Sequence, residues 1–260
     1  MAEEATLRIY RGDNQDGQMV DYKIPVAPGM VVLDAVHAVQ AMHSPDLAVR
    51  WNCKAGKCGS CSAEVNGKPR LMCMDRMDKY PAGEPITIRP VKSFPVMKDL
   101  ACDVSWNYEV NKKIPPFKMR RVTSPLATSH QGEGKDEEPR FSQAEADRVQ
   151  EFRKCIECFL CQNVCHVLRE HQKYPEYGGP RFFVRVASLE MHPLDAGDRL
   201  ELVKDQLGLG YCNITYCCTE VCPESIKITN NAIIPLKERV VDRFYDPVKK
   251  LLRVVFPKKS

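Results

Sequence analysis

The placement of the cysteines constrains this chain more than any other feature: 13 occur in 260 residues, and all but one fall into three clusters. The N-terminus, Met1–Glu4, is acidic where a secretory signal peptide is basic, and no apolar segment follows it. We therefore expect the chain to stay in the compartment where it is made. In a reducing compartment, clustered cysteines are metal ligands or catalytic thiols more often than disulfides.

The first cluster reads C-K-A-G-K-C-G-S-C, and a further cysteine follows it after a short segment. The spacing C-x4-C-x2-C with a later cysteine is typical of plant-type [2Fe–2S] ligands. The two glycines of the loop let the backbone wrap a cluster and direct N–H groups at its sulfurs. Zinc is the alternative, although zinc sites usually pair two short knuckles, whereas here three cysteines share one loop. The pattern favours a [2Fe–2S] cluster bound by Cys53, Cys58, Cys61 and Cys73.

The segments around this loop carry the patterns of a small mixed sheet with one helix. Asn66-Gly67 is a two-residue hairpin signal that would return Cys73 towards the loop. The other expected elements are strands at Thr6–Tyr10, Val20–Ile24, Ser62–Val65, Pro69–Cys73 and Ile86–Pro90, and a helix at Val32–Met42.

The second and third cysteine clusters form a matching pair of ligand runs. The run C-I-E-C-F-L-C-Q-N-V-C has the bacterial ferredoxin spacing C-x2-C-x2-C-x3-C, in which the fourth cysteine ligates the other cluster of a pair. The run C-N-I-T-Y-C-C-T-E-V-C-P is a second copy with Thr215 in the second place. Exchanging the fourth cysteines predicts a [4Fe–4S] site and a three-thiolate [3Fe–4S] site, and zinc is a poor competitor for this interleaved pattern. The predicted ligands are Cys155, Cys158, Cys161 and Cys222 for the first site, and Cys165, Cys212 and Cys218 for the second.

The remaining candidate residues are predicted to bind nothing. Cys102 lies in a mixed apolar stretch typical of a small buried hydrophobe. Cys217 could compete with Cys218 or fill the vacant corner, but its neighbour has the better spacing. His166 and His171 are needed by neither site. No phosphate-binding or nucleophile motif is present, and a net charge of +4 is too balanced to indicate nucleic acid, so we expect no catalytic residue and an electron-transfer role.

The sequence predicts an α+β chain of two domains. A β-grasp, plant-type [2Fe–2S] ferredoxin domain spans residues 1–110, and an all-α, two-cluster bacterial-ferredoxin-like domain spans residues 143–260. Residues 111–142 form a linker or insertion, in which Ser124–Pro139 lacks apolar periodicity, and a capping box at Ser142–Glu145 starts a helix. Further helices are expected at Ala187–Met191, Arg199–Gln206 and Leu236–Phe244. The basic tail Val248–Ser260 is either a solvated end or a contact with an anionic membrane surface.

The order of these three motifs resembles the iron–sulfur subunits of succinate dehydrogenase and fumarate reductase. The resemblance implies a flavoprotein partner that carries FAD, one or more membrane-anchor subunits, and a quinone at the anchor interface. Electrons would pass from flavin through the [2Fe–2S], [4Fe–4S] and [3Fe–4S] clusters to quinone, as part of the tricarboxylic acid cycle and the respiratory chain. The subunit would be peripheral, on the cytoplasmic face of the cell membrane. No apolar run approaches the ~20 residues of a membrane-spanning helix, which agrees with this expectation.

The chain departs from the common family pattern at the quinone end. His166 follows Cys165 where many members have proline, the tryptophan of the family's next segment is missing, and Asn213 stands where a histidine is common. The ligand pattern itself is intact. Alternative interpretations are a fumarate reductase working in reverse, a ferredoxin-like subunit of another flavin-linked oxidoreductase, and a zinc-stabilised binding module.

Overall fold

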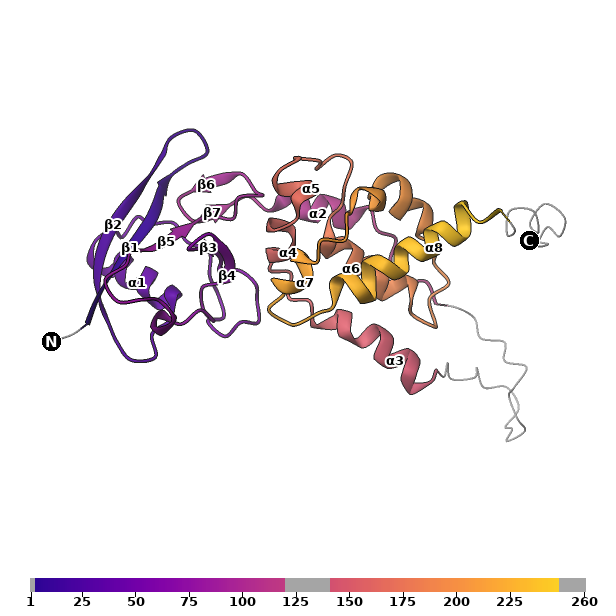
Figure 1. Ribbon diagram of the computed structural model, residues 1–260, viewed down its shortest axis with the longest axis horizontal. Coiled ribbons are helices and arrows are strands. Elements are labelled where there is room, and N and C mark those ends of the chain that lie inside the picture. The colour runs from indigo at the N-terminus through magenta and orange to yellow at the C-terminus, as the bar shows by residue number, and fades with distance from the viewer. Residues whose placement is uncertain (1–2, 120–140, 248–260) are drawn as a thin grey trace.

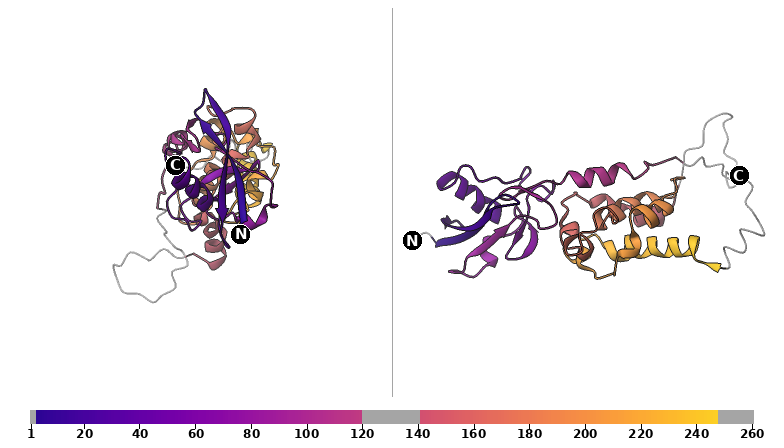
Figure 2. Two further views of the ribbon diagram at one scale, coloured as in Figure 1. Left: turned by 90° about the vertical axis from the view of Figure 1, so that its left-hand side faces the viewer. Right: turned by 90° about the horizontal axis from the view of Figure 1, so that it is seen from above.

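The computed structural model describes residues 3–119 and 141–247. A strand-rich first domain and a helical second domain lie end to end along the long axis of the molecule (Figures 1 and 2). Within the described ranges, no helix is both long and apolar enough to cross a bilayer. Residues 120–140 of the predicted linker 111–142, which include Ser124–Pro139, and the basic tail Val248–Ser260 lie outside the described residues.

The first domain is built on a five-stranded sheet with the order β2-β1-β5-β3-β4. Leu7 and Ile9 on β1 alternate with polar residues and pair in parallel with Ile86 and Ile88 of β5, and all four are buried. One helix, α1, contributes Val36 to the same core. The bounds are β1 Glu3–Gly12, β2 Gly17–Val26, α1 Val32–Met42, β3 Ser62–Val65, β4 Lys68–Leu71, the short 3₁₀ turn η1 Met77–Lys79 and β5 Ile86–Arg89. The expected mixed sheet with one helix is confirmed.

The predicted hairpin at Asn66-Gly67 is also confirmed. Both residues have positive φ, +46° and +72°, as a two-residue turn between twisted strands requires. A second, smaller hairpin was not predicted: β6, Val96–Lys98, pairs with β7, Ala101–Cys102. The side chain of Cys102 is buried with Phe94 and Phe159, which confirms its prediction as a small hydrophobe.

The second domain is a set of short helices around α6. Phe182, Phe183 and Val186 of α6 are buried at the centre of this core. Val110, the last residue of the predicted first domain, and Ile114, within the predicted linker 111–142, belong to the same core. The bounds are α2 Ser105–Lys112, α3 Gln143–Gln150, α4 Leu160–Asn163, α5 His166–Arg169, α6 Pro180–Glu190, α7 Cys217–Glu220 and α8 Ile234–Phe244, with 3₁₀ turns η2 Glu151–Lys154 and η4 Leu209–Tyr211 and π-helical turns η3 Leu202–Gln206 and η5 Ile228–Ile233.

The helix predictions hold in part. The capping box is present: the Ser142 hydroxyl accepts from the Glu145 N–H, and the Glu145 carboxylate accepts from the Ser142 N–H. The predicted helix Ala187–Met191 is only the end of α6, which starts at Pro180, a residue suited to the first helical turn. Most of the predicted helix Arg199–Gln206 is the π-helical turn η3 rather than an α-helix.

Candidate functional site

The loop that carries Cys53, Cys58 and Cys61 connects α1 to β3, and the β3–β4 hairpin returns Cys73 to it. The backbone N–H groups of Ala55 and Lys57 donate to the Cys53 sulfur at 3.4 and 3.3 Å. The N–H of Gly56 donates to the Cys73 sulfur at 3.3 Å. The loop therefore directs backbone dipoles at sulfur, which stabilises thiolates and the anionic cluster they would bind.

The thiols of this group lie close enough to shift one another's pKa. Burial, together with the neighbouring thiols of Cys73 and Cys58, raises the pKa of Cys61 to about 12. Burial opposes ionisation of Cys58 as well, but hydrogen bonds from Ser60 and Cys53 outweigh it and lower the pKa of Cys58 to about 6. Such neighbours cannot all be thiolates unless a cation compensates them, which fits an iron cluster.

The two ferredoxin-like runs share a local backbone pattern of two left-handed residues followed by a short helix. The residues on either side of Cys158 have φ values of +55° and +60°, and the residues on either side of Thr215 have values of +57° and +63°. Each run then enters a one-turn helix, α4 or α7. The structure thus gives Thr215 the backbone position of Cys158, and it gives Cys217 the position of Leu160.

One group of thiols comes from both runs. Burial raises the pKa of Cys158 to about 12, and the thiols of Cys155 and Cys222 add to the effect. Burial and these same thiols, with that of Cys158, raise the pKa of Cys161 well above its usual value. The four cysteines line one pocket with apolar side chains that include Val184 and Ile228. The structure therefore brings Cys222 of the second run to the three cysteines of the first.

The other three predicted ligands form a second group. Burial raises the pKa of Cys218 to about 11, with contributions from the thiols of Cys212 and Cys165. Two hydroxyl groups that the sequence did not single out lie beside this group. The Tyr177 hydroxyl is 3.7 Å from the Cys165 sulfur, and the Thr229 hydroxyl is 3.5 Å from the Cys218 sulfur. Hydrogen bonds to ligating sulfurs tune the potential of a cluster.

Cys217 has different neighbours. Its sulfur lies 3.4 Å from Nε2 of His166 and 3.1 Å from the hydroxyl of Thr215. Cys217 is half-buried, whereas its neighbour Cys218 is buried among the second group of thiols. In residues 3–119 and 141–247, no three Cys, His, Asp or Glu side chains converge on a point where they could hold a single metal ion.

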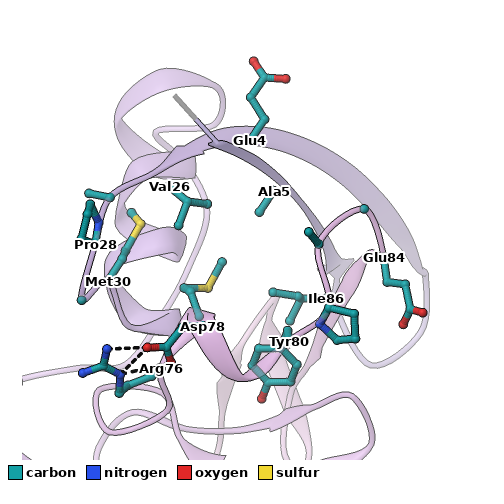
Figure 3. Close-up of a pocket in the computed structure, with 16 residues that line it drawn as sticks. Glu4, Ala5, Val26, Pro28, Met30, Arg76, Asp78, Tyr80, Glu84 and Ile86 are labelled. Carbon is teal, nitrogen blue, oxygen red and sulfur yellow. Dashed lines mark hydrogen bonds and ion pairs between the residues drawn. The ribbon is translucent and has the colours of Figure 1, made fainter. Parts of the chain in front are cut away.

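A separate pocket of about 670 Å³ lies in the first domain beside β1 and β5. Apolar side chains such as Val26 and Ile86 line it, with the Arg76–Asp78 ion pair at one edge (Figure 3). None of the residues that line this pocket is a cysteine, so the pocket is not one of the predicted cluster sites.

Two family models match separate parts of the chain. Residues 6–109 match the family model of the 2Fe-2S iron-sulfur cluster binding domain, and residues 151–226 match that of the 4Fe-4S dicluster domain. The predicted α+β fold, with a ferredoxin-type first domain and a helical second domain, is confirmed.

Individual relatives cover most of the chain. A chain of the Mycobacterium smegmatis Sdh1 complex in the apo form is 55% identical, with a TM-score of 0.87 over 95% of this chain and 100% of that one. The succinate dehydrogenase iron-sulfur subunit of Bacillus subtilis is 30% identical over 89% of this chain and 91% of its own length. One component of the CoM/CoB fumarate reductase of Methanothermobacter marburgensis is also 30% identical, but this chain spans only 42% of its length. The chain belongs to the family of iron–sulfur, electron-transfer subunits of succinate dehydrogenase and fumarate reductase.

Proposed function

We propose that this chain relays electrons between a flavoprotein subunit that carries FAD and a quinone at a membrane-anchor subunit. The observation that carries the proposal is the separation of the thiols into three groups, one in the first domain and two in the second. Iron–sulfur clusters bound by these groups would accept and donate single electrons over a range of potentials.

The ligand sets follow from these groups. In the first domain, Cys53, Cys58, Cys61 and Cys73 would hold [2Fe–2S]. In the second domain, the pocket formed by Cys155, Cys158, Cys161 and Cys222 would hold [4Fe–4S]. The remaining group, Cys165, Cys212 and Cys218, supplies three thiolates and suits [3Fe–4S], because a threonine hydroxyl at position 215 ionises far less readily than a thiol.

The surface of the first domain supports a docking site for the flavoprotein. Cys53 is exposed, and the nearby residue Trp51 is 46% exposed. The ammonium group of Lys54 lies 5.1 Å from the centre of the Trp51 ring. Tryptophan is enriched among the residues that contribute most to protein–protein binding. The opposite domain would then face the anchor and the quinone, and the chain would be peripheral on the cytoplasmic face of the membrane.

Analysis of the metals in the anaerobically purified complex tests the proposal. We expect iron and acid-labile sulfide, a [2Fe–2S] signal in the reduced protein, and the paramagnetic signal of a three-iron cluster in the oxidised protein. A colourless chain that contains zinc would overturn the proposal and support a zinc-stabilised binding module. Two four-iron signals and no three-iron signal would overturn the assignment of the last site alone.

The membrane partner is tested separately. The chain should remain on membranes that contain the anchor subunit and should appear in the soluble fraction when the anchor is deleted. Retention of the chain by membranes that lack every other subunit would contradict peripheral attachment through a partner.

A further inference from the structure

The ligand loop of the first domain is in direct contact with a ligand of the second. The Ser62 hydroxyl, next to Cys61 in sequence, donates a 2.8 Å hydrogen bond to the carbonyl oxygen of Cys158. It also lies 3.1 Å from the carbonyl oxygen of Gly59. One hydroxyl thus joins the loop of the [2Fe–2S] group to the backbone of a [4Fe–4S] ligand, where β3 and β4 face α4 (Figure 1).

Gly59 lies against the same residue. A Cβ atom at position 59 would lie 2.6 Å from the Cα atom of Cys158 and 2.7 Å from the carbonyl oxygen of Ile156. Both atoms belong to the backbone, so no side-chain rotation could relieve the overlap. An added methyl group would have to move the two ligand loops apart.

We propose that Gly59 and Ser62 are positioning residues that set the separation, and hence the electronic coupling, between the first and second cluster sites. The inference rests on the proposed ligand sets. Electron-transfer rates fall steeply with the distance between redox centres and depend on the bonded path between them. The path from Cys61 through the Ser62 hydroxyl to the Cys158 carbonyl crosses the domain boundary by a single hydrogen bond.

Other contacts hold the two domains together independently of this one. The Ser93 hydroxyl lies 3.2 Å from the Asn163 carbonyl oxygen, and the Ser93 N–H donates to the Asn163 side chain at 3.0 Å. Removing the Ser62 hydroxyl therefore leaves the domains docked. The substitution therefore alters only the contact between the two ligand loops.

The chain offers a matched control for each substitution. Gly83 of the first domain also has a positive φ, +84° against +68° for Gly59, but a Cβ there would meet no atom of the described residues within 4 Å. Gly83→Ala therefore adds comparable backbone strain outside the ligand loop, without pressing on Cys158. Ser93→Ala removes a hydroxyl from the same domain boundary that contacts the backbone carbonyl oxygens of Gln162 and Asn163, neither of which is a predicted ligand.

The test uses the assembled complex and two measurements. The magnetic interaction between the reduced [2Fe–2S] and [4Fe–4S] clusters, measured by electron paramagnetic resonance, reports their separation. The rate of electron transfer between them after flash reduction reports their coupling. Ser62→Ala should slow this transfer several-fold, and Gly59→Ala should both slow it and weaken the magnetic interaction, at unchanged iron content. Gly83→Ala and Ser93→Ala should behave like the wild type.

The possible failures are distinguishable. Absence of the two cluster signals from the unmutated complex would refute the proposed function. Normal signals with an unchanged transfer rate in Ser62→Ala would refute only the positioning role. The same would follow if Ser93→Ala slowed transfer as much as Ser62→Ala, because the effect would then belong to domain docking in general. If Gly59→Ala failed to assemble, Ser62→Ala would still decide the question.

Discussion

The side-chain amide of Asn163 in α4 donates a 2.8 Å hydrogen bond to the carboxylate of Glu64 in β3, across the boundary between the two domains. Asn163 is fully buried and Glu64 is 6% exposed. The guanidinium group of Arg169 pairs with the same carboxylate. A buried carboxylate thus accepts from two partners of the other domain, which satisfies the charge that burial would otherwise penalise.

We expect Glu64→Ala to destabilise the docked arrangement. The substitution leaves the Asn163 amide and the partly buried Arg169 without an acceptor, at a cost of about 2–3 kcal/mol. For a chain of this size that corresponds to a melting temperature roughly 5–10 °C lower. Thermal unfolding followed by circular dichroism measures the change. Lys92→Ala is the control, because the Lys92–Glu170 pair crosses the same boundary but both side chains are half-exposed, so its loss should cost less than about 1 kcal/mol. Equal effects of the two substitutions would contradict the role of the buried network.

This boundary could not be predicted from the sequence. Asn163 is 99 residues from Glu64 and 70 residues from Ser93, and no local pattern marks any of the three as a partner. The Asn66-Gly67 turn and the Ser142–Glu145 capping box could be predicted, because both depend on hydrogen bonds between residues that are close in sequence. The contacts between distant residues depend on the tertiary structure. So do the π-helical turns η3 and η5, because the spacing of their apolar residues does not differ enough from that of an α-helix to be recognised in the sequence.

Cys73→Ser should abolish the first cluster and leave the other two in place. The first thiol group shares no member with the groups of the second domain, and its core is built around a separate sheet. In the complex, succinate should still reduce the flavin, while quinone reduction should be strongly slowed. Electron paramagnetic resonance of the reduced and oxidised protein counts the remaining clusters. Loss of all three signals would show that the domains do not assemble independently.

Thr215→Cys should convert the third site to [4Fe–4S]. The backbone gives Thr215 the position that Cys158 has in the first run, so a thiolate there would supply the missing ligand. The iron content should rise by one atom per chain, and the three-iron signal of the oxidised protein should disappear. The added negative charge should also lower the potential of the site.

Cys217→Ser is the matched control for this experiment. Cys217 has the backbone position of Leu160 rather than that of a ligand, and its sulfur lies beside His166. The iron content and the three-iron signal should therefore be unchanged. Loss of the third cluster in this variant would identify Cys217 as a ligand and refute the assignment made from spacing.

The grouping of the thiols in the second domain could be anticipated from two features of the sequence. Both runs have cysteines at short fixed spacing with left-handed residues between them, and the two-cluster ferredoxin pattern exchanges the fourth cysteines of the runs. The hydroxyl groups of Tyr177 and Thr229 could not be predicted. Each reaches its sulfur from another element, through packing that only the folded chain creates.

The stability of the first domain should depend on His37 in mildly acidic solution. Nε2 of His37 is buried and has no hydrogen-bond partner within the described part of the chain, and the ring packs edge-on against Trp51 at 4.7 Å. Burial, and then the charge of Lys54, lower the pKa of His37 in the folded protein below the value of about 6.5 expected in the unfolded chain. The unfolded state therefore binds more protons, so stability is lost as the pH falls below about 6.5. His37→Phe keeps a ring against Trp51 but cannot titrate, so melting temperatures measured between about pH 7.5 and 5.5 should fall more steeply for the wild type. Parallel curves for the two proteins would show that His37 stays free to ionise in the fold.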